Sequence, residues 1–371
     1  MSGIYAATAF HHHHSTQPPV IQQAIRLEGI EALRGLAAIM VVIGHTLDDA
    51  VHFGVKPGIV PDWSIWNAGV DLFFVISGFI MMWTFGDRFG SAGAVRQFAV
   101  RRLSRIVPLY WLTTAVTALL VLIWPSLFDR STFGWSHLLL SLLFVPHYTR
   151  GGELLPMVGV GWTLNYEMFF YLVFALGLLL PKGKGLCLVV LIMVGSFLTA
   201  SLFGAGLGSI AHFLANSVVL DFLLGLGLAQ VVHLTGLRRP VLLLTSAAAL
   251  VASVLLPNLI GGMRFILVGL PALAVLSATL ALYPSRSGLF GPAVLTLGAA
   301  SYALYLFHPL VLNLTKAAML HISPAVTVMP IHLFGVYAIG ALLLSVVGAL
   351  LVRTHLELPL LRLCRRMFEP T

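Results

Sequence analysis

The sequence predicts an all-α polytopic membrane protein. Of its 371 residues, 59% are hydrophobic and only 9% are charged, and the mean hydropathy is +0.98. The hydrophobic residues gather in stretches long enough to cross a hydrocarbon core of about 30 Å at about 1.5 Å per helical residue. A water-soluble chain of this length would carry far more charge. These observations exclude a soluble globular protein.

We expect about ten spanning helices. Their approximate ranges are 33–50, 66–85, 103–124, 159–180, 186–203, 210–234, 241–257, 263–282, 296–319 and 330–352. The segment from Trp135 to Pro146 is apolar but too short to span, so it is predicted to be interfacial or re-entrant. We see no internal repeat and no matched pair of broken helices, which weakens a transporter interpretation.

The arginines and lysines predict that both termini are cytoplasmic. With ten alternating helices, the clusters Arg101-Arg102 and Arg238-Arg239, the pair Lys182 and Lys184, and the basic C-terminal tail all fall inside. Few cations fall outside, as the positive-inside rule requires. Counting 135–146 as a further span would move both Lys182–Lys184 and Arg238–Arg239 outside, so we reject that count. The net charge of +8 then reflects topology and not nucleic-acid binding.

The chain ends are predicted to lie outside the membrane domain. Residues 1–29 form a polar, disordered tail without a cleavable signal, residues 30–353 form the membrane domain, and residues 354–371 form a basic cytoplasmic tail. The run His11 to His14 resembles a tag and receives no function. The two cysteines suggest neither a disulfide nor a metal site, and no metal is expected. Oligomeric state is left open.

Arg34 and His45 are two costly residues in the first apolar stretch. An ionisable residue inside a membrane predicts a functional site. Eleven helical steps bring the two side chains to the same face, roughly 16 Å apart along the axis. His45 is the best candidate for a general base, because imidazole titrates near neutral pH.

Glu167 and His308 are predicted to share the depth of His45 on two other helices. Glu167 could orient the imidazole, or it could form a buried structural pair. His308 precedes Pro309, which predicts a kink. Ser301, Tyr305 and His308 share one helical face, which could line a cavity or bond neighbouring helices.

Asp71 stands in an apolar run and therefore needs a partner. It could be a structural counter-ion for an arginine or for His45, or it could act directly. Together with Trp162, Ser301, Tyr305 and His308, it completes the residues that we expect to bind substrate or line its cavity.

Arg102 and Arg105 lie three residues apart at the predicted inner surface, where Arg34 also enters. Arginine binds phosphate through a fork of donors, so the three residues predict a site for a multiply anionic cytosolic ligand. A phosphate-bearing head with an arm of roughly 16 Å would reach His45. Coenzyme A has that shape. Positive-inside anchoring alone is the simpler explanation of such a cluster.

Five stretches together resemble the acyltransferase-3 family of bacterial integral-membrane acyltransferases, in the branch that acetylates exopolysaccharide. They are Ile30-Glu-Ala-Leu-Arg-Gly-Leu-Ala-Ala through His45, Gly69-Val-Asp-Leu-Phe-Phe-Val-Ile-Ser-Gly-Phe, Arg101-Arg-Leu-Ser-Arg-Ile-Val-Pro-Leu-Tyr, Trp162-Thr-Leu-Asn-Tyr-Glu and Ser301-Tyr-Ala-Leu-Tyr-Leu-Phe-His-Pro. The resemblance covers the chain after its first thirty residues.

The resemblance implies an O-acyltransferase of the bacterial inner (plasma) membrane. It implies a cytosolic acyl-CoA donor, most simply acetyl-CoA, and a sugar hydroxyl on a glycan or its lipid-linked precursor as acceptor. Arg34, Arg102 and Arg105 would hold the CoA phosphates. His45 would deprotonate the acceptor or carry the acetyl group, and Glu167 would orient or charge it. The alternatives are a transporter of an anionic lipid or glycan, and a structural subunit of an export complex.

Overall fold

The computed structural model describes residues 20–50, 53–55, 66–128, 133–204, 206, 208–236, 238–260, 263–282, 290–322 and 329–368, and the side chains of these except 20–27, 260 and 322. Helices make up nearly all of this part of the chain, and it contains no strand. The all-α prediction is confirmed. The run His11 to His14 lies outside the described residues. Helix α1 begins at Val20, inside the segment 1–29 that we predicted to be a disordered tail.

Nine helical segments of the described chain are long and apolar enough to cross a membrane. They are built on α1 (Val20–Asp48), α2 (Ala68–Phe85), α3 (Ala94–Ile123), α6 (Lys182–Phe203), α8 (Asp221–Thr235), α9 (Arg239–Leu255), α11 (Leu270–Leu282), α13 (Ser301–Ile322) and α14 (Ile331–Val352). Helix α5 (Trp162–Leu178) occupies the remaining predicted position, with 17 residues. Helix α4 (Trp135–Leu142) has eight residues and is too short to span, as the segment 135–146 predicted.

Two predicted spans are broken. The stretch 210–234 contains α7 (Ser209–Leu214), a short 3₁₀ helix and α8, because Asn216 is extended and its side chain accepts a hydrogen bond from the Val218 N–H. The stretch 296–319 contains the end of α12 (Pro292–Ala299) and most of α13. Gly298 of α12 lies directly on the Glu31 backbone of α1, and this crossing turns the chain at Ala300.

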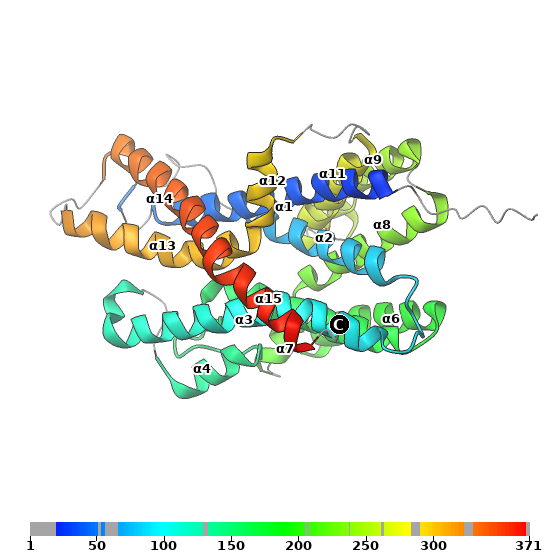
Figure 1. Ribbon diagram of the computed structural model, residues 1–371, viewed down its shortest axis with the longest axis horizontal. Coiled ribbons are helices and arrows are strands. Elements are labelled where there is room, and N and C mark those ends of the chain that lie inside the picture. Colours follow the sequence, from blue (N-terminus) through cyan, green and yellow to red (C-terminus); the bar gives the residue numbers. More distant parts are fainter. Residues whose placement is uncertain are drawn as a thin grey trace, which may run out of the picture.

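The C-terminal segment is more ordered than a tail. After α14 the chain continues through a π-helical turn (Arg353–Glu357) into α15 (Leu358–Phe368). Helix α15 packs on α3 and crosses it in the view of Figure 1. Arg96 donates a hydrogen bond to the Phe368 carbonyl, which holds the end of α15 to α3.

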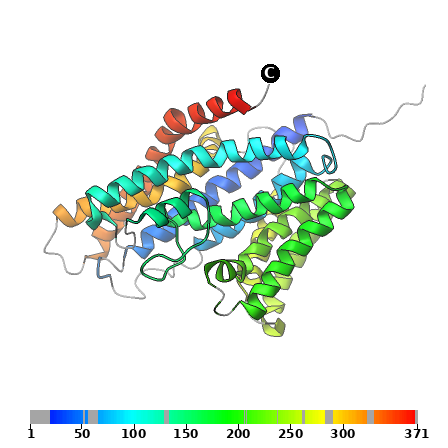
Figure 2. The ribbon, with the colours of Figure 1, turned by 90° about the horizontal axis from the view of Figure 1, so that it is seen from below.

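The helices form two groups that face each other. Figure 1 shows α1, α2, α8, α9, α11, α13 and α14 in one group and α3, α4 and α6 in the other. Figure 2, turned by 90°, shows α6, α8 and α9 projecting together below the long helices. Helix α2 packs on α1 and on α8, and α3 packs on α5 and α13. The predicted site residues come from α1, α2, α3, α5 and α13, so they lie where the groups meet.

The crossing of α2 and α8 depends on two glycines. A Cβ atom at Gly225 would overlap the Val75 carbonyl oxygen, and one at Gly78 would overlap the Phe222 carbonyl oxygen. Backbone atoms of both helices are therefore in contact, as small residues permit in membranes.

We expect Gly225→Ala to destabilise the protein by about 2 kcal/mol or more, because the overlap is with backbone and not with a movable side chain. Thermal unfolding in detergent would measure the loss. Gly227→Ala is the matched control, since Gly227 lies on the same helix with open space around it. Equal stability of the two variants would contradict this packing.

Candidate active site

The three predicted arginines lie in one cavity. Arg34 of α1 lines it together with Arg102 and Arg105 of α3, and the cavity encloses about 740 Å³ of empty space, part of it open to solvent. We call this the arginine cavity. Arg34 is buried and lies 3.4 Å from the Glu31 carboxylate. Helix α3 begins nine residues before the predicted 103, so Arg102 and Arg105 sit inside the helix rather than at its start.

Glu167 lies in the arginine cavity as well. Its Oε1 accepts hydrogen bonds from Tyr171 at 2.6 Å and from Ser77 at 3.4 Å. The Tyr171 ring also lies under the Arg102 guanidinium, 5.9 Å from ring centroid to Cζ. Arg102, Tyr171 and Glu167 thus form a continuous row along one wall. Neither Ser77 nor Tyr171 was predicted, because nothing in the local sequence separates them from other residues of a membrane helix.

His45 lies in a second cavity, which we call the histidine cavity. It encloses about 1630 Å³ of empty space, part of it open to solvent, and its wall includes His45, His137, Trp162 and Lys316. The sequence predicted that Arg34 and His45 look the same way along one helix. The structure places them in different cavities, and the described side chains that line both are Val70 and Tyr305.

Tyr305 is fixed at the junction of the two cavities. Its hydroxyl lies 2.9 Å from the Val160 carbonyl and 2.8 Å from Thr163 Oγ1. Thr163 Oγ1 also lies 3.0 Å from the Val160 carbonyl, so the tyrosine and threonine hydroxyls share one acceptor and either of them can donate to the other. The ring of Phe73 meets that of Tyr305 edge-on at 5.8 Å. The junction is therefore a rigid aromatic wall.

His308 and Ser301 are fully buried and line neither cavity. The His308 ring lies behind His45, with 5.3 Å between ring centroids, and its Nδ1 lies 3.1 Å from the Leu304 carbonyl. Because α13 turns this face toward the packed interior, the expectation that Ser301 and His308 line the substrate cavity does not match the geometry. His308 instead contacts the candidate base itself.

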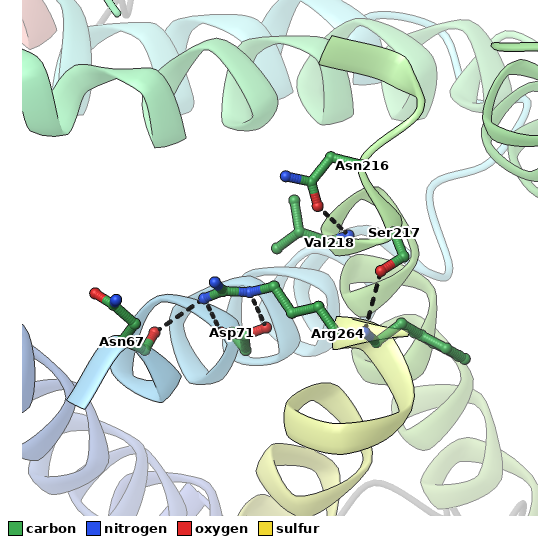
Figure 3. Close-up of polar contacts among 7 residues, drawn as sticks. Asn67, Asp71, Asn216, Ser217, Val218 and Arg264 are labelled. Atoms are coloured by element: carbon green, nitrogen blue, oxygen red, sulfur yellow. Dashed lines mark hydrogen bonds and ion pairs between the residues drawn. The ribbon is translucent and has the colours of Figure 1, made fainter. Parts of the chain in front are cut away.

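Asp71 pairs with an arginine, which was one of the two alternatives for it. Arg264 donates hydrogen bonds to both oxygens of the fully buried Asp71 carboxylate, from Nε at 3.0 Å and from Nη2 at 2.6 Å (Figure 3). Nη2 also donates to the Asn67 carbonyl. Asp71 lines neither cavity, whereas Arg264 lines the histidine cavity. Asp71 is thus a structural counter-ion and not a substrate ligand in this arrangement.

A second buried ion pair was missed. Asp49, on the turn after α1, lies 3.4 Å from Lys316 Nζ and accepts a hydrogen bond of 2.6 Å from the Tyr337 hydroxyl. Both charged residues line the histidine cavity. A lysine inside the predicted span 296–319, three residues before its end, was the available signal. In the part of the chain that is described, no group of three or more His, Cys, Asp or Glu side chains is placed to hold a metal ion.

Comparisons with known proteins place the chain in a family. A family model described as an acyltransferase domain matches residues 27–350. The exopolysaccharide production protein ExoZ of Rhizobium meliloti (strain 1021) is 34% identical over 313 residues, which cover 81% of this chain and 90% of that protein. The acyltransferase MdmB of Streptomyces mycarofaciens is 25% identical over 370 residues, with 93% and 94% covered. No solved structure matches significantly. The chain is a polytopic membrane protein that belongs to the acyltransferase-3 family.

Proposed function

We propose that this protein transfers an acetyl group from acetyl-CoA to a sugar hydroxyl of an exopolysaccharide or of its lipid-linked precursor. Family membership supports acyl transfer, and the name of the relative, exopolysaccharide production protein ExoZ, supports an exopolysaccharide acceptor. One observation carries the proposal: the arginine cavity and the histidine cavity adjoin, because Val70 and Tyr305 line both of them. Such a pair of cavities can hold a phosphorylated donor on one side and a hydroxyl acceptor on the other.

The arginine cavity suits the donor. Coenzyme A carries several phosphates, and Arg34, Arg102 and Arg105 offer forked donors for them. Beyond the arginines the wall combines apolar side chains, such as Phe73 and Ile106, with hydroxyl groups and the Glu167 carboxylate, and its apolar part suits the thin pantetheine arm. Arg34 and His45 are eleven residues apart on α1, or roughly 16 Å. An arm of that length brings the thioester to the junction. On this proposal the arginine cavity faces the cytosol, and the membrane is the bacterial inner membrane.

His45 supplies the chemistry at the junction. As a general base it takes the proton of the acceptor hydroxyl while the oxygen attacks the thioester carbonyl. The C–S bond breaks, the leaving sulfur takes the proton from His45, and the products are an O-acetyl sugar and free CoA. On the second route, the imidazole nitrogen attacks the thioester carbonyl and the CoA thiolate leaves; the sugar oxygen then takes the acetyl group from the imidazole, and the hydroxyl proton passes to the thiolate. The His308 ring packs against the His45 ring. That Glu167 orients or charges His45 stays a prediction, because Glu167 lines the arginine cavity and His45 the histidine cavity, and the Glu167 carboxylate accepts hydrogen bonds from Tyr171 and Ser77.

A transfer assay tests the proposal. The purified protein in nanodiscs would receive [¹⁴C]acetyl-CoA and the de-O-acetylated exopolysaccharide of the organism that makes it. We expect labelled O-acetyl groups on the glycan and one CoA released per group. CoA release without ester formation, or glycan movement without CoA release, would contradict the proposal.

The donor site gives a prediction of its own. Arg102→Ala should raise the Kd for CoA by about 10- to 150-fold, because a charge-assisted hydrogen bond contributes about 1.5–3 kcal/mol. Isothermal titration with CoA would measure this. Arg101→Ala is the matched control, since Arg101 is the exposed neighbour on α3 and does not line the cavity. Equal affinities of the two variants would remove Arg102 from the donor site.

A further inference from the structure

The short helix α4 contributes one titratable side chain, His137, to the histidine cavity. His137 Nδ1 lies 2.7 Å from His147 Nε2, and the two rings meet edge-on with 4.9 Å between centroids. His147 Nδ1 in turn lies 2.8 Å from the Val145 carbonyl. Neither histidine has a place in the mechanism described above.

When both rings are neutral, the contact with a backbone carbonyl determines which nitrogen of each ring carries the proton. The Val145 carbonyl can only accept, so His147 carries its proton on Nδ1 and, when neutral, presents a lone pair at Nε2. His137 must then donate from Nδ1, which leaves the lone pair of a neutral His137 on Nε2. Partial burial, together with the neighbouring His147, lowers the pKa of His137 and so favours its neutral form.

His137 lines the cavity, and its Nε2 is accessible. This nitrogen has no hydrogen-bond partner among the described residues, and it is not one of the buried unpartnered atoms found there. Asp48 and Asn313 line the same cavity, and within the described residues their side chains make no hydrogen bond or ion pair. The Trp162 indole forms part of the wall. A sugar ring offers several hydroxyl donors and an apolar C–H face. The acceptor atoms of His137 and Asp48, the amide of Asn313 and the indole of Trp162 are suited to bind such a ring.

We propose that the histidine cavity binds the acceptor sugar and that His137 Nε2 accepts a hydrogen bond from one of its hydroxyls. This hydroxyl is a second one, distinct from the hydroxyl that His45 activates. The inference rests on the proposed acetyl transfer and adds a residue that selects the acceptor. The acceptor class is a sugar with at least two hydroxyls within reach of one ring face.

Two substitutions of His137 distinguish a role in sugar binding from a role in stabilising the fold. In His137→Asn, the amide nitrogen takes the place of Nδ1 and can still donate to His147, but nothing replaces Nε2. In His137→Gln, the amide oxygen reaches the place of Nε2 and can still accept. His212→Gln is the matched control, because His212 of α7 bonds the neighbouring Tyr148 and does not line the cavity.

The measurement is equilibrium binding of the de-O-acetylated oligosaccharide repeating unit of the organism's exopolysaccharide, with CoA affinity as the internal reference. We expect His137→Asn to raise the sugar Kd by about 3- to 12-fold, the range of one neutral hydrogen bond. His137→Gln should recover most of the affinity, and His212→Gln should match the unmodified protein.

The outcomes also separate this inference from the proposed function. Unchanged sugar affinity in His137→Asn would overturn the inference while leaving acetyl transfer intact. Equal loss of sugar affinity, CoA affinity and thermal stability in both His137 variants would overturn it too, because it would show a structural role. Weaker sugar binding in His137→Asn, in a protein that transfers no acetyl group, would support the sugar subsite and refute the proposed reaction.

Discussion

Replacing His45 with alanine is expected to lower acetyl transfer by about 10²- to 10⁴-fold, the usual contribution of a positioned acid–base group. His45 lines the histidine cavity beside the junction at Tyr305, where the thioester and the acceptor hydroxyl would meet. Alanine removes the proton acceptor and leaves the arginine cavity intact. The measurement is the initial rate of labelled acetyl transfer at saturating acetyl-CoA.

The control for His45→Ala is donor affinity. Because the three arginines lie in the other cavity, the variant should bind CoA with nearly the same Kd and should elute as folded protein. His321→Ala provides a second control, since it removes a histidine at the far end of α13 that lines neither cavity. Full transfer activity in folded His45→Ala protein would exclude His45 as base and as acetyl carrier.

Arg264→Ala is expected to cost about 3 kcal/mol of stability. It leaves the fully buried Asp71 carboxylate without its cation, and breaking a buried pair from one side typically costs about 3–5 kcal/mol. We take the lower end because the Arg264 side chain is 32% exposed, which lets water reach the pair. Asp221, also fully buried and within electrostatic reach of Asp71 and Arg264, loses the same cation.

Thermal unfolding in nanodiscs would measure the effect of Arg264→Ala. Arg150→Ala, which changes an exposed arginine, should leave the unfolding temperature nearly unchanged. Adding Asp71→Asn to Arg264→Ala should recover part of the loss, because the second change removes the unpaired charge. A double variant that is less stable than Arg264→Ala would contradict the counter-ion role of Asp71.

Hydropathy was enough to predict the helices but not their breaks. The stretch 296–319 is apolar throughout, and only the contact of Gly298 with the α1 backbone explains the turn at Ala300. The break before α8 had a local signal, because Asn216 is a strong N-cap residue type and sits inside the predicted span. The length of an apolar stretch predicts that it lies in the membrane. It does not predict where a helix is interrupted by its packing against another helix.

Sequence spacing predicted that Arg34 and His45 share one helical face but not what separates their surroundings. Arg34 and His45 lie on one helix, yet Tyr305 and Val70 from other helices stand between their cavities. Asp71 and Arg264 are 193 residues apart, so their pairing is a property of the folded bundle. His137 lies in a short segment with no repeating pattern, and only the folded chain brings it to the cavity wall.

The central claim is that the donor extends from the arginine cavity to the junction beside His45. The most direct measurement is a cryo-electron microscopy map of the protein in nanodiscs with a non-hydrolysable acetyl-CoA analogue. The account predicts phosphate density against Arg34, Arg102 and Arg105, and the acyl carbon beside Tyr305 within reach of His45. Phosphates bound outside the arginine cavity, or an acyl carbon remote from His45, would contradict it.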